Sequence, residues 1–311
     1  MRIATIDIGT NSVLLLIAEV DAGSGTLTAV LERATITRLG QGVDHNRRLL
    51  PEAAERTLAC LTEYADTLRE QGVTRLDAVG TSAMRDAVGG QDFVARAARI
   101  LGVAPRVIDG HEEARLTFAG ALSGLSIAGP VVVFDIGGGS TEIVVGEVGP
   151  AGRAISAAVS LDIGSVRLFE RHVRSDPPAA AELSEVDADI AQALRGAPEL
   201  AAGATLIGVA GTVTQLAALE LGLLRYDAAR VHGSELARGS VDRWAAKLAT
   251  STLAERRLYP GMEPSRADVL VVGSAIARAV LHWSGARKLV VSDRGVRWGL
   301  CQELAAHSRA P

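Results

Sequence analysis

Two short stretches of the chain decide the fold: DIGTNS at residues 7–12 and DIGGGS at residues 135–140. Each follows an apolar run and leads into a second apolar run that ends in Glu-Val. Their offset is 135 − 7 = 128, and the same offset relates Gly80 to Gly208, which both precede a loop of small residues. One offset shared by two motif pairs predicts two similarly folded halves that face each other across a cleft.

Strand-like and helix-like patterns alternate along the chain, which predicts an α/β fold. We expect two domains, residues 1–127 and 128–311, with the last helix, about 297–311, available to pack on the first domain. Apolar runs predict strands at 3–8, 13–20, 26–37, 76–80, 131–135 and 288–291. Helical spacing predicts helices at 51–72, 91–101, 111–125, 164–173, 178–194, 212–221 and 266–283.

Composition narrows the class of protein. The chain has 311 residues, with 22% charged and 48% hydrophobic side chains and a net charge of 32 − 36 = −4. This balance argues against nucleic acid as a partner, and no apolar run approaches the roughly 18 residues of a membrane span. Two cysteines cannot build a disulfide framework, and the N-terminus does not resemble a signal peptide. We therefore expect a cytoplasmic protein with reduced thiols.

The glycines at residues 137–139 suggest a phosphate-binding loop. Glycine lets backbone N–H groups approach an anion closely, and successive N–H groups form an anion-binding concavity. A plain β-hairpin turn would also use glycines, so a single such loop is weak support. The related loop at residues 9–12, which is also preceded by an acid, favours phosphate binding.

Three carboxylates accompany these loops. Asp7 and Asp135 end otherwise apolar strands, where a carboxylate is costly unless it is paired, hydrogen-bonded or metal-bound. Glu142 follows on the returning strand, and strand alternation can turn it toward the loop. The three predict a Mg²⁺ (or Mn²⁺) site, because Mg²⁺ prefers carboxylates, waters and substrate phosphates. The alternative for Glu142 is a solvent-facing strand position.

A further acid and an arginine complete the candidate set. Glu113 lies in the first turn of a helix capped by Asp109 or Gly110, where the helix dipole alone would favour an acid. Arg85 follows the second small-residue loop of the first half, and could either neutralise phosphate oxygens or be an ordinary solvated side chain. The chain has no CxxC, HExxH, GxSxG or GxxxxGK[ST] motif, which leaves zinc, thiol, serine-elbow and P-loop chemistry without support.

Taken together, these motifs resemble the exopolyphosphatase and guanosine pentaphosphate phosphohydrolase (Ppx/GppA) family, in its short two-domain form. The family belongs with actin, Hsp70 and the sugar kinases, and the resemblance implies two ribonuclease-H-like, or actin-like ATPase, domains. It runs almost end to end and is carried by the segments at 7–12, 81–85, 110–115, 134–142, 164–168, 208–212 and 292–299. The combination of GGGSTE with EEAR is the most specific part.

The resemblance implies a role for each candidate residue. Glu113 would be the catalytic base and Arg85 would stabilise charge on the terminal phosphoryl group. Asp135 and Glu142 would serve the metal and the attacking water, and Asp7 would complete the metal site. The residues expected to bind phosphate are Thr10, Asn11, Ser12, Ser82, Gly137, Gly138, Gly139, Ser140, Thr141, Arg167, Gly211 and Thr212.

The expected activity is hydrolysis of the terminal phosphoanhydride of inorganic polyphosphate, by a protein that the resemblance suggests is a homodimer. Conversion of guanosine pentaphosphate (pppGpp) to tetraphosphate (ppGpp) is the nearest alternative, because both substrates present a terminal anhydride. A kinase of the same fold and a non-catalytic alarmone-binding or polyphosphate-binding regulator are more distant. This chain also departs from the family pattern, with Leu14 where a basic residue is common and without a C-terminal helical module, which puts long-chain processivity in doubt.

Overall fold

The computed structural model describes residues 1–21 and 23–307. The chain divides into two compact units, which are described separately. The first unit holds Met1–Gly120 together with Val296–Pro311, and the second holds Ala121–Gly295. The sequence suggested a boundary between residues 127 and 128 and a last helix, about 297–311, that could pack on the first domain; in the structure the boundary follows Gly120, and the chain returns to the first unit at Val296.

The first unit is built on a five-stranded sheet of order β3-β2-β1-β4-β5. β1 pairs antiparallel with β2 and parallel with β4, so the loops after β1 and β4 leave the same edge of the sheet. Alternating apolar residues bury one or both faces of the central strands, which is why these runs form strands. The strands are β1 (Arg2–Ile8), β2 (Ser12–Val20), β3 (Leu27–Ile36), β4 (Arg75–Gly80) and β5 (Arg106–Val107).

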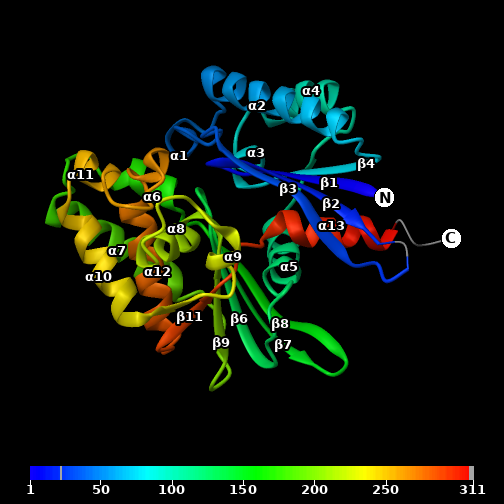
Figure 1. The fold of residues 1–311 in the computed structure, drawn as a ribbon. Coiled ribbons are helices and arrows are strands. Elements are labelled where there is room, and N and C mark those ends of the chain that lie inside the picture. The colour runs from blue at the N-terminus through cyan, green and yellow to red at the C-terminus, as the bar shows by residue number, and fades with distance from the viewer. Residues whose placement is uncertain (22, 308–311) are drawn as a thin grey trace. The chain divides into compact units, whose positions relative to one another are not determined.

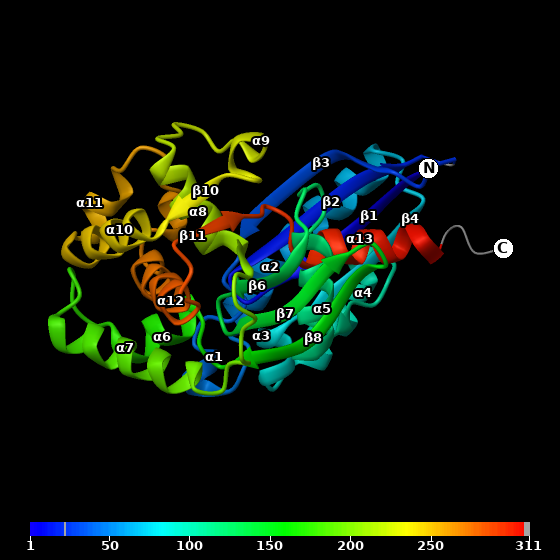
Figure 2. The same cartoon turned by 90° about the horizontal axis from the view of Figure 1, so that it is seen from below.

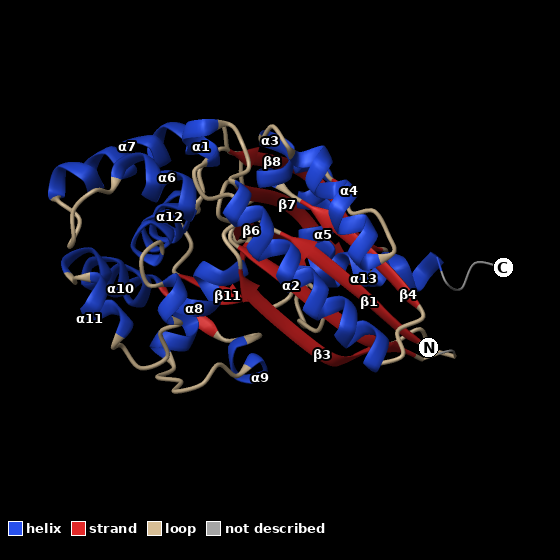
Figure 3. Ribbon diagram, turned by 90° about the horizontal axis from the view of Figure 1, so that it is seen from above, coloured by secondary structure: helices blue, strands red, loops and turns tan. Residues whose placement is uncertain are grey.

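Helices cover both faces of this sheet. α2 (Pro51–Glu70), with Pro51 in its first turn, lies beside α4 (Gly90–Leu101) on one face, as Figures 1 and 3 show. α13 (Val296–His307) contacts β1, β2 and β4 on the other. The remaining helices of the first unit are α1 (Val43–Asn46), α3 (Ser82–Asp86) and α5 (Gly110–Ala121), whose last residue already belongs to the second unit.

Burial of its apolar face explains why α13 belongs to the first unit. Trp298, Cys301 and Leu304 pack against Ile3 and Leu16 of the sheet. Three hydrogen bonds of the same helix reinforce this position. The hydroxyl of Thr5 donates to the Arg297 carbonyl at 2.8 Å, and Glu32 Oε2 accepts from Arg297 Nη2 at 2.6 Å and from Trp298 Nε1 at 3.1 Å.

The second unit repeats this sheet plan. Read from β8, its six strands run β8-β7-β6-β9-β11-β10, with β6 antiparallel to β7 and parallel to β9, as in the first unit. The predicted α/β fold of two similar halves is therefore confirmed. The strands are β6 (Gly129–Ile136), β7 (Thr141–Gly149), β8 (Gly152–Leu161), β9 (Thr205–Val209), β10 (Glu235–Ala237) and β11 (Lys288–Val291).

The offset of 128 does not hold for the pairing of the central strands. Gly80 pairs with Ile8, a separation of 80 − 8 = 72, whereas Gly208 pairs with Phe134, a separation of 208 − 134 = 74. In the sheet, Gly208 thus corresponds to Ala78 rather than to Gly80. The helices that follow start at N-caps Thr81 and Val209, again 128 residues apart. The predicted equivalence of the two glycines is wrong for the sheet, but the two helix starts do correspond.

The helices of the second unit pack around α12 (Leu270–Trp283), which contacts α6, α7, α8 and α10 (Figure 2). The residues predicted as one helix at 266–283 form a 3₁₀ turn, η1 (Pro264–Arg266), followed by α12. The others are α6 (Ser165–His172), α7 (Ala180–Leu194), α8 (Ala210–Glu220), α9 (Ala228–Val231), α10 (Arg238–Thr250) and α11 (Leu253–Arg257). Within the described residues, no helix is both long and apolar enough to cross a membrane.

Candidate active site

The hairpin loops after β1 and β6 close in the same way. Gly9 N donates to Ser12 O at 3.0 Å, and Gly137 N donates to Ser140 O at 3.0 Å. A Cβ atom on either glycine would lie 3.1 Å from the accepting carbonyl oxygen. Such a contact is tight, so a glycine suits the first position of both loops. The two related sequence motifs therefore produce the same local turn.

In the first unit, the loops after β1 and β4 are joined by their side chains. Thr10 Oγ1 and Ser82 Oγ lie 2.7 Å apart and are buried, which links the β1–β2 loop to the start of α3. The carbonyl of Asn11 accepts from the backbone N–H groups of Thr37 and Arg38. Among the described residues, Asn11 Oδ1 is buried and has no hydrogen-bond partner. Three of the predicted phosphate-binding residues, Thr10, Asn11 and Ser82, thus gather at one edge of the sheet.

The first unit also brings Arg85 and Glu113 together. Arg85 Nη1 lies 3.3 Å from Glu113 Oε2 and donates to the Ile108 carbonyl at 3.0 Å, while Arg85 Nε lies 3.6 Å from Asp86 Oδ1. Glu113 is only 8% exposed, although it lies in the first turn of a helix. The helix dipole therefore does not fully explain its position, because a dipole partner can remain at the surface. The arginine therefore holds one oxygen of the Glu113 carboxylate, Oε2.

The helix that carries Glu113 begins at the expected cap. Asp109 Oδ1 accepts from the backbone N–H of Glu112 at 2.8 Å, and this hydrogen bond lowers the pKa of Asp109. Of the two caps predicted, Asp109 is the one that supplies a side chain. Glu112 faces the surface and pairs with Arg106 at 2.7 Å. The two neighbouring glutamates thus have different surroundings, Glu113 buried beside Arg85 and Glu112 half-buried beside Arg106.

In the second unit, the glycine loop is held from behind by α6. The carbonyls of Gly137 and Gly138 accept from the backbone N–H groups at the start of α6, at 2.9–3.0 Å. Because a trans peptide is planar, its N–H points opposite to its C=O. The N–H groups of Gly138 and Gly139 therefore point away from α6, as a phosphate-binding loop requires.

Arg167 and Thr141 face the backbone. Arg167 is 7% exposed and donates through Nε to the Gly139 carbonyl at 2.6 Å. Thr141 Oγ1 donates to the Ile163 carbonyl at 2.6 Å. Both side chains were expected to bind phosphate. Their geometry instead suits holding the loop in shape.

Asp135 and Glu142 stand directly opposite each other on β6 and β7. Opposed residues of an antiparallel pair have Cβ atoms about 4.5–5.5 Å apart on one sheet face, where like charges repel. Glu142 is 1% exposed and accepts from Ser160 Oγ at 2.7 Å, so the solvent-facing alternative is excluded. In the first unit, Leu14 stands opposite Asp7.

The structure does not show the three-carboxylate metal group predicted from Asp7, Asp135 and Glu142. Asp7 belongs to the first unit, and the second unit supplies only the Asp135–Glu142 pair. In the part of the chain that the structure describes, no group of three or more His, Cys, Asp or Glu side chains is arranged to hold a metal ion.

The loop at Gly211 and Thr212 opens α8, and it brings in a residue that the sequence did not indicate. A Cβ atom at Gly211 would lie 1.9 Å from Arg266 Nη1, so the guanidinium rests directly on this glycine. Burial lowers the pKa of Arg266. Thr212 is buried, and Gly273 of α12 leaves room for it, since a Cβ there would lie 2.6 Å from Thr212 Oγ1. Only the tertiary structure places Arg266 at this loop.

Comparisons with known proteins identify the family of this chain. The family model described as the Ppx/GppA phosphatase family matches residues 16–307. The chain is 42% identical to exopolyphosphatase 2 of Mycobacterium tuberculosis, over 98% of each protein. It is also similar to the crystal structure of a Ppx/GppA family member from Aquifex aeolicus, with a TM-score of 0.83 and 34% identity over 100% of this chain and 99% of that one. An exopolyphosphatase structure from Cytophaga hutchinsonii matches with a TM-score of 0.87 and 27% identity, covering 99% and 98%.

Proposed function

Because the chain belongs to the Ppx/GppA phosphatase family, we infer that it is an exopolyphosphatase, which releases orthophosphate from the end of inorganic polyphosphate. The observation that carries this function is the contact between the buried carboxylate of Glu113 and Arg85. A protein that only bound polyphosphate would have no need of a buried carboxylate with one oxygen held by an arginine. The contact gives the first unit a base and a charge-stabilising group side by side.

We propose that Glu113 positions and deprotonates the attacking water. The water oxygen forms a bond to the terminal phosphorus, the bond to the bridging oxygen breaks, and the proton of the water passes to the Glu113 carboxylate. Arg85, which holds Oε2, stabilises negative charge on the phosphoryl oxygens. Most of the rate enhancement in such transfers comes from positioning and electrostatic stabilisation. This explains why a glutamate, a weak base at neutral pH, can serve here.

The phosphate chain is bound by the loops. Backbone N–H groups of Gly138, Gly139 and Ser140 are proposed to bind phosphate oxygens, with Arg167 and Thr141 as positioning residues behind them. Further contacts would come from Thr10, Asn11, Ser12 and Ser82 in the first unit and from Gly211, Thr212 and Arg266 in the second. This assignment adds Arg266, whose guanidinium lies against Gly211.

The residues of the second unit also fit a divalent cation. Asp135 and Glu142 are opposed carboxylates on one face, so their mutual repulsion favours a bound cation, and Mg²⁺ or Mn²⁺ prefers such oxygen ligands. When bound, the ion would neutralise charge on the substrate phosphates. Asp7 is a further candidate from the first unit. Loss of activity in EDTA and its recovery with Mg²⁺ or Mn²⁺ would support this assignment.

The remaining proposals concern the cellular setting. We propose that the protein acts in the cytoplasm as a homodimer, which the family resemblance supports. Its two cysteines, Cys60 and Cys301, are buried and free, as expected of a protein from a reducing compartment. Light scattering of the purified protein tests the dimer, with a monomer mass as the contradicting result.

The substrate is tested by comparing phosphate release from short polyphosphate, long polyphosphate and pppGpp, each with Mg²⁺ and with EDTA. Metal-dependent release from short polyphosphate is the expected result. Release from pppGpp alone would keep the chemistry but assign the protein to alarmone conversion and the stringent response. Binding of all three without any release would indicate a regulator. ADP formation from ATP with a small acceptor would indicate a kinase.

A further inference from the structure

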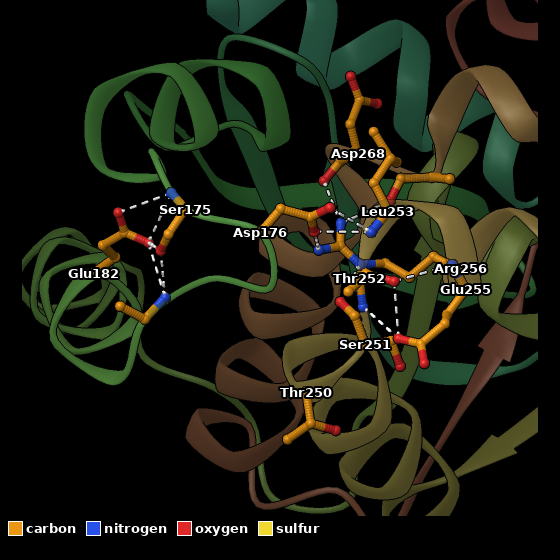
Figure 4. Close-up of polar contacts among 12 residues, drawn as sticks. Ser175, Asp176, Glu182, Thr250, Ser251, Thr252, Leu253, Glu255, Arg256 and Asp268 are labelled. Atoms are coloured by element: carbon orange, nitrogen blue, oxygen red, sulfur yellow. Dashed lines mark hydrogen bonds and ion pairs between the residues drawn. The ribbon is translucent and has the colours of Figure 1, made fainter.

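A buried arginine holds the segment that carries Arg266. Arg256, near the end of α11, is only 2% exposed, and its guanidinium makes three hydrogen bonds to backbone carbonyls and one ion pair (Figure 4). Nη1 donates to the Ala267 carbonyl at 3.0 Å and to the Asp268 carbonyl at 3.3 Å, and Nε donates to the Ser251 carbonyl at 3.1 Å. Nη2 lies 3.3 Å from Asp176 Oδ1. One side chain thus joins three separate chain segments.

Asp176 completes this arrangement from the loop before α7. Its carboxylate also accepts from the backbone N–H of Leu253, at 2.8 and 3.0 Å, at the start of α11 (Figure 4). The same helix is capped by Thr252, whose hydroxyl accepts from Glu255 N. Both the backbone that carries Arg256 and its guanidinium are therefore held by Asp176.

A charged residue in this place calls for an explanation. Burial lowers the pKa of Arg256, and the nearby carboxylates of Asp176, which forms the ion pair, and Asp268 only partly offset this effect. Replacing a buried ion pair by apolar side chains of similar volume is often neutral or stabilising. What an apolar side chain cannot do is hold several carbonyls in a fixed geometry, which the planar guanidinium with its five donors can do.

Two of the three carbonyls that Arg256 holds belong to the two residues directly after Arg266. Arg266 itself lies in η1, a 3₁₀ turn of three residues that is too short to define a side-chain direction alone. We propose that Arg256 is a positioning residue, which fixes the backbone at Ala267 and Asp268 so that the Arg266 guanidinium rests on Gly211 and binds a phosphate of the substrate. This inference deepens the proposed function and rests on it.

A double-mutant cycle tests the proposal with tripolyphosphate as the probe. Arg256→Met and Arg266→Met are each expected to raise KM about tenfold while kcat changes less than about twofold, because a charge-assisted contact to a non-reacting phosphate is lost. The double variant is expected to have the KM of Arg266→Met alone, because Arg256 acts through Arg266. Arg256→Lys should recover only part of the loss, because an ammonium cannot hold the same set of carbonyls.

The matched control is Arg238→Met. Arg238 also donates to a backbone carbonyl of the second unit, Ala286 O, at 2.9 Å from Nε, but it does not contact the segment 264–268. Its variant is expected to keep the wild-type KM. A KM that multiplies to about a hundredfold in the Arg256/Arg266 double variant would overturn the proposal, as would an Arg256→Met variant with the wild-type KM.

Two further measurements separate the possible causes of failure. If Arg256→Met does not fold, as judged by its thermal transition, Asp176→Asn replaces it in the cycle, because its amide oxygen can still accept from Leu253 N while the negative charge that faces Arg256 Nη2 is lost. If the wild type releases no phosphate from any substrate, the proposed function fails. Calorimetric binding of tripolyphosphate to the wild type, the two single variants and the double variant then decides whether Arg256 acts through Arg266. The Kd of the double variant is expected to equal that of Arg266→Met alone.

Discussion

Gly164→Ala is expected to damage the site by displacing the glycine loop. Gly164 is the N-cap of α6, whose backbone N–H groups hold the glycine loop. A Cβ atom at this position would lie 2.4 Å from the Gly138 carbonyl oxygen and 2.5 Å from the carbonyl carbons of Gly138 and Gly139. All three are backbone atoms, so no side chain can rotate away to relieve the contact.

The size of the effect follows from this distance. An ordinary contact needs 3.4 Å, so the loop or the helix must move by about 1 Å (3.4 − 2.4). A misplacement of about 1 Å can cost about 10²-fold in rate, and overpacking typically costs about 1–3 kcal/mol of stability. We therefore expect kcat/KM for tripolyphosphate to fall about a hundredfold in a variant that is still folded at 25 °C.

The assay compares initial rates of phosphate release with the thermal transition of each variant. Gly239→Ala on α10 is the matched control, because no atom lies within 4 Å of a Cβ at that position. Its rate should equal that of the wild type, and its Tm should be equal or slightly higher, since alanine favours helix. A Gly164→Ala protein with kcat/KM within twofold of the wild type would refute the argument that α6 sets the position of the loop.

Further predictions concern three buried residues, Trp298, Gly273 and Cys301. Trp298→Ala should lower the free energy of unfolding by about 3–5 kcal/mol in urea titration, because Trp298 is 2% exposed in the core beneath α13; a loss below about 1 kcal/mol would contradict this packing. Gly273→Ala should reduce both activity and stability, because its Cβ would lie 2.6 Å from Thr212 Oγ1, and a variant with wild-type kinetics would count against the role of Thr212. Burial raises the pKa of Cys301 to about 12 from 9.0, so a thiol reagent at pH 8 should modify it only after unfolding. For the same reason, unfolding free energy should fall as pH rises from about 9 toward 12, because only the unfolded thiol ionises there, and Cys301→Ser should reduce that dependence.

The hairpins at the two glycine loops could be predicted because their signals are local. Alternating apolar residues, a closing glycine and a repeated acid lie within a few positions of each other around 7–12 and 135–140. The pairing of β9 with β6 could not be predicted in this way. Parallel strands are joined by long crossovers, so their register depends on packing rather than on a turn. The strand pairing of the two sheets differs by two residues, and this difference is not visible in the offset of 128 between the sequence motifs.

In the candidate site, too, some features could be predicted from local motifs, whereas others depend on how the chain folds. Glu113 and Arg85 could be found from their motifs, although their contact at 3.3 Å depends on where α5 and α3 lie. Arg266 could not be found, because its relevance comes from Gly211, more than fifty residues earlier in the chain. Arg167 was found, but its contact with the Gly139 carbonyl was not, because burial and hydrogen-bond partners are properties of the folded chain. Sequence patterns identify chemical groups, while folding decides which of them face the substrate.

The most direct test of the account compares two neighbouring glutamates. Glu113 is buried beside Arg85, whereas Glu112 lies at the surface beside Arg106. Both can be changed to glutamine, which keeps the size of the side chain and removes the carboxylate. The account predicts that Glu113→Gln loses at least about 10²-fold in kcat for phosphate release from tripolyphosphate, with an unchanged Tm, while Glu112→Gln retains the wild-type rate. A Glu113→Gln protein that releases phosphate at the wild-type rate would contradict the central claim.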